Sequence, residues 1–187
     1  MPGRGKRFAI RLAAWVMAVL CLAPASADEQ TDRRILVGLK LFPAVLAADT
    51  QITKKTAADG MLHVAIVYKE RADVAEHAAG HLRKAGRVRD IPLAVDVVTY
   101  ADLATLTGPP AGVFLAEWAP QALPGAVRLG TRTGSIVFSP FRGDVALGAH
   151  AGVFVGDRIL PLVNPASLKA AGIELKPFFL EVARTHE

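Results

Sequence analysis

The sequence contains only one cysteine, Cys21, and this scarcity limits how the chain can be stabilised. A single thiol cannot form a disulfide within the chain, even in an oxidising compartment. The fold must therefore depend on an ordinary hydrophobic core. The apolar content of 52% is enough to build one in a chain of this length.

Long apolar runs are also scarce, and the one that stands out lies near the start, from Leu12 to Leu22. Basic residues precede it, and an Ala-Ser-Ala triplet at positions 25–27 follows it. This order is typical of a secretory signal peptide. The run is shorter than the roughly 20 residues that cross a bilayer, which makes a retained anchor the weaker alternative. We expect a signal peptide over residues 1–27, cleavage between Ala27 and Asp28, and export to the periplasm.

The surplus of basic residues disappears once the expected signal peptide is set aside. The whole chain has 22 basic and 17 acidic residues and a net charge of +5. Four basic residues and no acidic ones lie in positions 1–27, so 22 less 4, or 18, basic residues face 17 acidic ones in the remainder. Nucleic-acid binding needs basic side chains clustered on the folded domain, so we expect no nucleic-acid partner. Residues 28–187 have a normal size for a single domain.

The first half of this domain combines helical and strand patterns. Apolar residues from Ile35 to Leu46 recur at helical spacing, although Pro43 should kink or break that helix. Beyond a polar loop, apolar runs and amphipathic runs alternate. We expect strands over 61–68, 92–100 and 111–118, a helix over 71–86 that Gly86 ends, and a short helix over 101–106. This βαβ order is typical of a parallel sheet covered by helices.

The second half indicates an antiparallel arrangement. Strands are expected over 134–140, 151–155 and 158–163, with little helix between the first two. Gly156 and Asp157 suit a two-residue type II′ hairpin turn, in which glycine takes the positive φ. Asn164 suits the N-cap of a short helix that Gly172 ends, and a final helix is expected over 174–185. The fold class is α/β: an αβ sandwich whose mixed sheet carries the C-terminal helices.

Two histidines one helical turn apart, His77 and His81, could share a metal ion. Their order is Glu-His-x-x-x-His, however, and zinc proteases place the glutamate between the histidines in His-Glu-x-x-His. We favour an exposed helix face, and we rank a hydrolase or metalloenzyme last. His63 and His150 are interpreted as packed or solvated side chains. No metal and no cofactor is expected.

Serine nucleophiles and phosphate-binding loops find no support either. Ser135 and Ser139 lie outside the Gly-x-Ser-x-Gly turn that presents a nucleophile. The glycine-bearing segments lack the lysine and following helix of a phosphate-binding loop. No catalytic residue is assigned.

Glu117 and Trp118 are the candidates for ligand or partner contact. They follow the third apolar strand, and ligands of open α/β sheets bind beyond the carboxyl ends of parallel strands. The alternative, a strand-end charge and a packed indole, is the more common situation.

The last fifty residues resemble the YfiR-like family of exported bacterial proteins. The resemblance rests on the segments "IVFSP", "GDVALGAHAGVF", "DRILPLVN", "PASLKAAGI" and "KPFFLEVA". It implies a periplasmic αβ domain without catalytic activity. The type member restrains a membrane-anchored diguanylate cyclase by binding its periplasmic domain, which lowers cyclic di-GMP in the cell. Better-known members contain disulfide-forming cysteines, whereas residues 28–187 of this chain contain none. Redox control through such cysteines therefore does not carry over to this chain.

These observations leave two functions in competition. The first is a non-catalytic periplasmic regulator that contacts a membrane-bound sensor such as a diguanylate cyclase, with homodimer formation left open. The second is a small periplasmic solute-binding protein with a crevice near Glu117 and Trp118. On either view, we interpret Gly156, Asp157, Asn164 and Gly172 as structural residues.

Overall fold

The computed structural model describes residues 25–186, so most of the expected signal peptide lies outside the described residues. Two units are distinguished, one up to Arg33 and one from Arg34 onwards. The helices are α2 (Ala25–Ala48), α3 (Ala72–Ala85), α4 (Leu123–Thr133), α5 (Pro165–Ala170) and α6 (Pro177–Val182), with 3₁₀ turns η1 (Ile52–Lys55) and η2 (Asp102–Thr105). The strands are β1 (Leu62–Tyr68), β2 (Arg87–Val88), β3 (Ile91–Thr99), β4 (Gly112–Leu115), β5 (Ile136–Ser139), β6 (Ala151–Val155), β7 (Ile159–Val163) and β8 (Arg184–Thr185). Within this part of the chain, none of the helices has the length and apolar character that a bilayer span requires.

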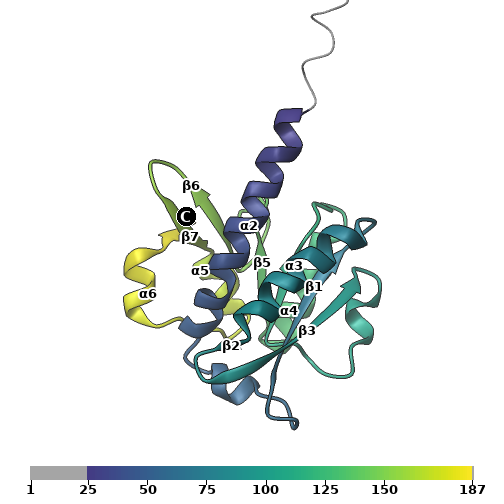
Figure 1. Cartoon of the computed structure of the whole chain (residues 1–187). Helices are drawn as coiled ribbons and strands as arrows, with labels where there is room; N and C mark the ends of the chain where they lie inside the picture. The colour runs from purple at the N-terminus through teal and green to yellow at the C-terminus, as the bar shows by residue number, and fades with distance from the viewer. Residues whose placement is uncertain (1–24, 187) are drawn as a thin grey trace, which may run out of the picture. The chain divides into compact units, whose positions relative to one another are not determined.

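All eight described strands form one mixed sheet in the order β2-β3-β1-β4-β5-β6-β7-β8 (Figure 1). Strands β3, β1, β4, β5 and β6 run parallel to one another. The pairs β2–β3 and β6–β7 are antiparallel, and β8 is parallel to β7. The predicted α/β class, with a βαβ first half and an antiparallel hairpin in the second, is therefore confirmed.

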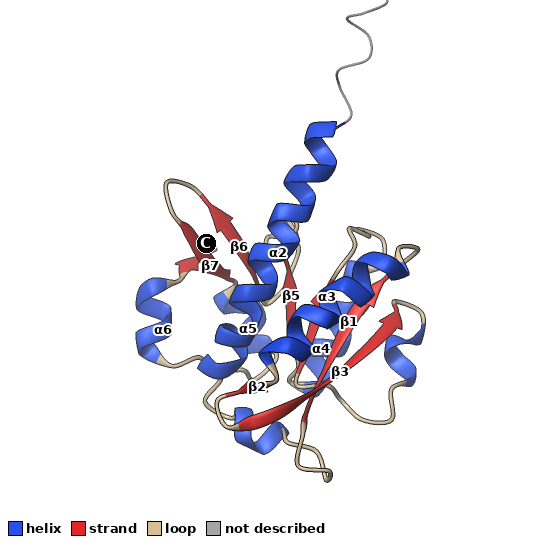
Figure 2. Cartoon of the chain, in the orientation of Figure 1, coloured by secondary structure: helices blue, strands red, loops and turns tan. Residues whose placement is uncertain are grey.

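Helices cover both faces of this sheet (Figure 2). The Phe42 ring of α2 lies 5.6 Å from the ring of Phe114 and 5.7 Å from that of Phe138. On α4, Gly130 approaches Val137 so closely that an added Cβ would lie 2.5 Å from a methyl carbon. Because neighbouring residues of a strand point to opposite faces, Phe138 and Val137 place α2 and α4 on opposite sides.

The N-terminal helix differs from the prediction in two respects. It begins at Ala25, so the polar stretch before Ile35 is helical as well. It also continues through Pro43 to Ala48, so of the two expected effects, a kink or a break, the break does not occur. Phe42 and Leu46 are buried on either side of Pro43, and this packing against the sheet outweighs the hydrogen bond that proline cannot donate.

The hairpin between β6 and β7 corrects the turn prediction. Val155 pairs with Ile159, so the loop has three residues instead of two. Gly156 does not have positive φ, so the turn is not type II′. Its glycine is explained by space, because a Cβ there would lie 2.8 Å from the Phe154 ring. Asp157 occupies the middle of the loop and is exposed.

The predicted boundaries of the short helix after β7 are confirmed, whereas the final helix, expected over 174–185, covers only Pro177–Val182. Asn164 is the N-cap of α5, with its side-chain oxygen accepting the backbone N–H of Ser167 at 3.0 Å. Gly172 follows that helix with φ +65°, the left-handed conformation that glycine adopts without strain. Buried side chains on α5 and α6, Leu168 and Phe179, pack these short helices onto the core.

One helix and two strands were not predicted from the sequence. Helix α4 connects β4 to β5, so the βαβ pattern extends one unit further than expected. Strand β2 forms a tight antiparallel connection with β3 through Arg89, which has φ +52°. Strand β8 falls within the segment expected to be the end of the final helix, and it closes the sheet beside β7.

Candidate functional site

The strand order changes direction beside β1, and this makes the carboxyl ends of β1 and β4 a topological switch point. From β1 the chain passes through α3 to β3 on one side, and it then returns to β4 on the other side. In doubly wound sheets this topological switch point is the usual ligand site. Glu117 lies there, two residues beyond the end of β4, as the sequence predicted.

At this edge of the sheet, the carboxylate of Glu117 itself occupies the backbone donors that a ligand could use. Its Oε2 atom accepts the backbone N–H groups of three successive residues, Lys69, Glu70 and Arg71, at 2.9, 2.8 and 2.9 Å. These residues connect β1 to the first turn of α3, and successive N–H groups of this kind form an anion-binding nest. Burial alone would raise the pKa of Glu117, but the three donors and the charge of Lys69 hold it below its usual value.

The neighbouring Trp118 has a different environment. Its side chain is 60% exposed, so the indole is not packed into the core as the common alternative would require. The Tyr100 hydroxyl donates a hydrogen bond of 3.1 Å to the main-chain carbonyl of Glu117. Of the two predicted residues, Glu117 is therefore held by the fold and Trp118 faces solvent.

A buried polar pair lies close to the same edge, at the end of β5. The Ser139 hydroxyl donates to the Asp144 carboxylate at 2.6 Å and accepts the N–H of Phe141 at 3.2 Å. Burial raises the pKa of Asp144, although the Ser139 hydrogen bond opposes this. Burial also raises the pKa of Tyr100 well above its usual value, and the charges of Asp144 and Glu117 add to this. Sequence patterns missed this group because Asp144 lies in an irregular segment without a recognisable motif.

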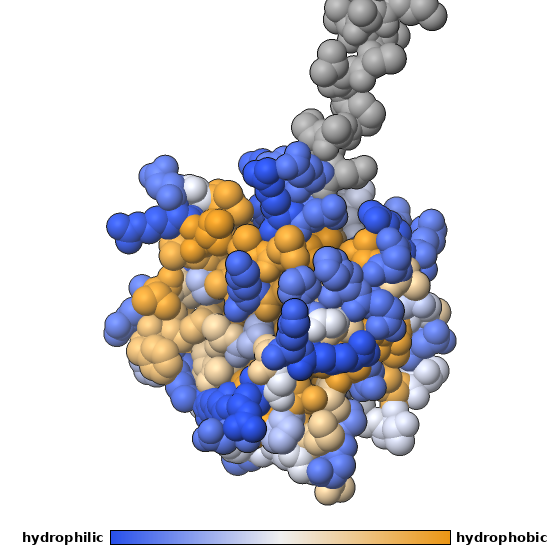
Figure 3. Space-filling view, in the orientation of Figure 1, coloured by the Kyte–Doolittle hydropathy of each residue, from blue (hydrophilic) through white to orange (hydrophobic). Residues whose placement is uncertain are grey.

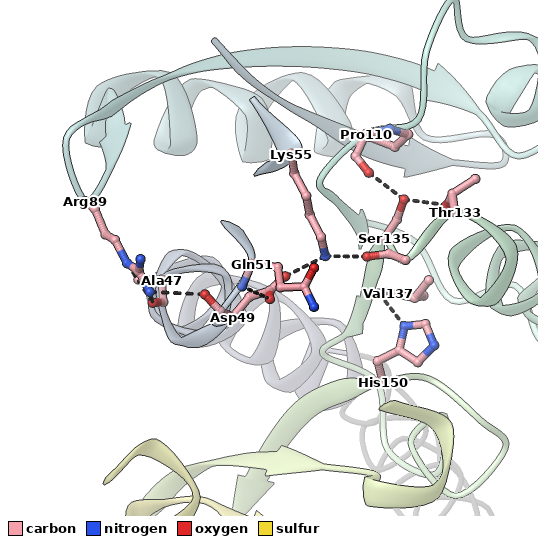
Figure 4. Close-up of polar contacts among 11 residues, drawn as sticks. Ala47, Asp49, Gln51, Lys55, Arg89, Pro110, Thr133, Ser135, Val137 and His150 are labelled. Carbon is pink, nitrogen blue, oxygen red and sulfur yellow. Dashed lines mark hydrogen bonds and ion pairs between the residues drawn. The ribbon is translucent and has the colours of Figure 1, made fainter. Parts of the chain in front are cut away.

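A second polar group lies at the opposite end of the sheet (Figure 4). Buried Asp49 forms an ion pair of 2.5 Å with Lys55, which also donates to the Gly134 carbonyl. The guanidinium of Arg89 donates to the main-chain carbonyls of Ala47 and Asp49. These contacts tie the end of α2 to η1 and to the β2–β3 turn.

His150 and Ser135 lie in the same interior region (Figure 4). The Nδ1 atom of His150 accepts the N–H of Val137 at 2.9 Å, and its buried Nε2 atom has no hydrogen-bond partner among the described residues. Burial lowers the pKa of His150 to about 4, with the Ser135 carbonyl opposing and the charge of Lys55 adding to the effect. Ser135 donates to the carbonyl of Pro110. Both side chains therefore serve the packed interior.

The remaining histidines do not converge on a metal site. His77 and His81 lie on α3 with ring centroids 5.0 Å apart. Across residues 25–186, no group of three or more histidine, cysteine, aspartate or glutamate side chains has an arrangement that could hold a metal ion. His63 contacts Asp59 through Nε2 at 2.8 Å and Asp96 through Nδ1 at 3.4 Å.

Comparisons with known proteins are limited to the fold. No family model and no curated protein matches the chain. A conserved domain protein from Vibrio cholerae matches with a TM-score of 0.50 at 15% identity, over 72% of this chain and 57% of that one. An ABC domain in complex with L-Trp from Streptococcus pneumonia matches with a TM-score of 0.49 at 12% identity, over 75% of this chain and 61% of that one. The chain thus spans less than two thirds of either protein, and the first likeness supports the α/β fold alone.

Proposed function

We propose that this chain is a non-catalytic periplasmic regulator that acts by contact with a membrane-bound sensor protein. The observation that carries the proposal is an exposed apolar surface at the end of the sheet formed by β6, β7 and α6. We call it the contact surface, and it comprises Val155, Ile159, Phe178 and Val182. Their side chains are 54%, 51%, 62% and 57% exposed. Large apolar side chains grouped on a surface are typical of protein interaction sites.

The backbone groups the members of the contact surface in two pairs. Val155 and Ile159 are direct partners across the hairpin, so their side chains lie on one face. Phe178 and Val182 are four residues apart on α6, which places them on one side of that helix. Apolar side chains gather over the hairpin and continue towards α6 (Figure 3).

Strand β8 connects these two pairs. It begins two residues after Val182 and pairs with β7, so the end of α6 is tied to the hairpin. The Arg184 guanidinium also lies 5.5 Å from the centroid of the Phe154 ring. A rigid base of this kind favours a preformed surface that binds without reorganisation.

The resemblance to the YfiR-like family supports the choice of partner. The segments that carry the resemblance lie within residues 136–183 and contain three of the four members of the contact surface, Ile159, Phe178 and Val182, while Val155 lies between two of the segments. In that family, the type member binds the periplasmic domain of a membrane-anchored diguanylate cyclase. We therefore take such a cyclase as the partner and restraint of its activity as the consequence of binding.

The test combines binding with a cellular readout. Purified chain is expected to recover a diguanylate cyclase from membranes, and deletion of the chain is expected to raise cyclic di-GMP. Ile159→Asp and Phe178→Asp each place a charge within the contact surface. Each variant should therefore fail to recover the cyclase and, in place of the wild-type chain, should leave cyclic di-GMP as high as the deletion does. Leu147→Asp is the matched control, since Leu147 is 66% exposed but lies in the connection between β5 and β6. Recovery of the cyclase by both contact-surface variants, or its absence with wild type, would refute the proposal.

One observation favours the alternative of a small solute-binding protein. A cavity of about 700 Å³ lies among η1, the start of β1 and the β3–β4 connection. This is not the position expected from the sequence, because Glu117 lies at the other end of the strands.

A further inference from the structure

The cavity lies at the amino-terminal ends of the parallel strands. Its lining comes from η1 and the loop before β1, from the β3–β4 connection, from β3 itself and from the end of α4. The polar and apolar side chains that line it include Lys54, Asp59, His63, Asp96, Leu106 and Thr107. Its volume of about 700 Å³ falls within the range of small-molecule sites in proteins.

The cavity exists because one crossover lacks a helix. Asp96 of β3 pairs with Ala65, which pairs with Val113, which pairs with Val137. Directly paired residues share a face, so Asp96 lies on the face that α4 covers further along the sheet. The β3–β4 connection contributes only the four-residue turn η2. The sheet next to β3 is consequently uncovered, and the side chains of His63 and Asp96 are 37% and 46% exposed.

Opposite charges line the cavity in nearly equal number. His63 lies between two carboxylates, and its contact with Asp59 is the shorter, at 2.8 Å. Asp96 contacts His63 through Oδ2, and its Oδ1 atom has no donor among the described residues. The hydrogen bond to Asp59 raises the pKa of His63, burial opposes this, and Asp96 raises it further. When His63 is protonated, its imidazolium offsets one of the two carboxylates.

Lys54 provides the free positive charge. Its side chain is exposed at the cavity and has no ion-pair partner among the residues that the structure describes. The neighbouring Lys55 is already paired with buried Asp49, so it adds no net charge. A strongly anionic ligand would meet the two carboxylates, and a cation would meet Lys54. The balance favours a ligand that carries both charges.

We propose that this cavity binds a small zwitterion, such as a free α-amino acid. The ammonium group of Lys54 binds the ligand carboxylate, and the open oxygen of Asp96 accepts from the ligand ammonium group. Leu106 and the adjoining Pro109 and Pro110 contact an apolar side chain, and the hydroxyl of Thr107 is a further polar contact. This assignment does not depend on the regulatory function, because binding at the cavity requires no protein partner.

The test uses purified chain over residues 28–187 and a panel of free amino acids with apolar side chains. At least one of leucine, proline and phenylalanine is expected to bind saturably in calorimetry and to raise the melting temperature. The N-acetyl and C-amide forms of that amino acid each lack one charge. Both are expected to bind at least about 10-fold more weakly.

Matched variants locate the binding. Lys54→Met and Asp96→Asn are each expected to weaken binding about 10-fold, because each removes one charged contact. Lys84→Met, an exposed lysine of α3, should leave it unchanged. The proposal is overturned if no amino acid in the panel binds saturably. It is equally overturned if binding survives both cavity substitutions or depends on only one of the ligand's two charges.

Discussion

The side-chain amide of Asn164 serves two elements at once. Its oxygen caps α5 through the Ser167 N–H, and its nitrogen donates to the carbonyl of Val145 at 2.8 Å. Asn164→Ala is expected to lower the free energy of unfolding by about 2 kcal/mol. About half of this comes from the lost cap and the rest from the lost hydrogen bond to the buried Val145 carbonyl, which keeps only the Gly148 N–H at 3.2 Å. Urea unfolding measures the difference.

A second substitution separates the two contributions. Serine is also a good N-cap, but its short hydroxyl cannot replace the contact with Val145. Asn164→Ser is therefore expected to lose about half as much stability as Asn164→Ala. Equal losses in the two variants would mean that the cap contributes nothing.

Buried His150 and partly buried His63 are expected to make the stability of the fold depend on pH in opposite directions. Burial keeps His150 neutral in the folded state with a pKa of about 4, whereas an unfolded histidine titrates near about 6.5. Between these values the unfolded chain binds more protons, so stability falls as the pH is lowered. The loss attributable to His150 approaches about 3 kcal/mol at the acid end. The raised pKa of His63 acts the other way: its contribution is complete below about pH 6.5 and is lost as the pH rises through the folded pKa.

Urea unfolding between about pH 4.5 and about pH 7.5 tests both signs. In His63→Gln the loss of stability on acidification should be steeper than in wild type, because the compensating group is gone. His81→Gln, which alters an exposed side chain of α3, is the matched control. If His63→Gln is equally stable at both ends of this range, the interpretation of buried His150 is wrong.

At the scale of elements, helix α4 depends on a close approach to the sheet. A Cβ at Gly130 would lie 2.5 Å from a Val137 methyl group and 2.7 Å from the Ser135 carbonyl oxygen. Gly130→Ala is therefore expected to destabilise the protein by about 1–3 kcal/mol, although alanine favours helices. Gly125→Ala in the same helix meets only a distant Arg128 nitrogen, at 3.9 Å. It should stabilise by about 0.5–1 kcal/mol. Thermal and urea unfolding of the pair should differ in sign, and two losses of equal size would refute the close-approach argument.

Helix α4 also shows why some helices cannot be predicted from the spacing of apolar residues. Its buried positions are Leu123, Ala126 and Gly130, so most of its apolar stripe consists of small residues. A search for large apolar side chains at helical spacing passes over such a stripe. Pro124 near the start and Gly134 just beyond the end were the signals that could have identified it. Elements with strong caps or long apolar runs, such as α3, α5 and β1, were predicted closely.

The candidate sites were less accessible to prediction than the elements. The position of Glu117 follows from the strand that precedes it, and the sequence located it correctly. The hydrogen bonds of Glu117 could not be predicted from the sequence, because their donors lie 46 to 48 residues earlier in the chain. The cavity brings together Lys54, His63, Asp96 and Thr107 from separate segments. The cavity forms because the connection between β3 and β4 contains only the 3₁₀ turn η2 and no longer helix, and no local sequence motif predicts this.

At the scale of the whole molecule, the predicted mature chain should be as stable as a longer one. The hydrophobic core, as far as the structure describes it, begins at Ile35, and the ion pair between Arg33 and Glu29 is exposed. A chain starting at Asp28 is expected to melt within about 2 °C of one that retains residues 25–27. Sequencing the N-terminus of the protein from a periplasmic fraction checks the expected cleavage site. A mature form that starts well beyond Asp28 would contradict that assignment.

The nest around Glu117 has a consequence for chemical rescue. The chain supplies its own anion to three backbone N–H groups, so Glu117→Ala should create an empty receptor for an external one. The variant is expected to lose about 1–3 kcal/mol of stability. Added acetate or formate should restore much of this saturably, whereas sodium chloride at the same ionic strength should not. A Glu117→Ala protein that is as stable as wild type, or that responds equally to every salt, would contradict this account. In chemical terms, Glu117 is a bound carboxylate ligand that happens to be attached to the polypeptide.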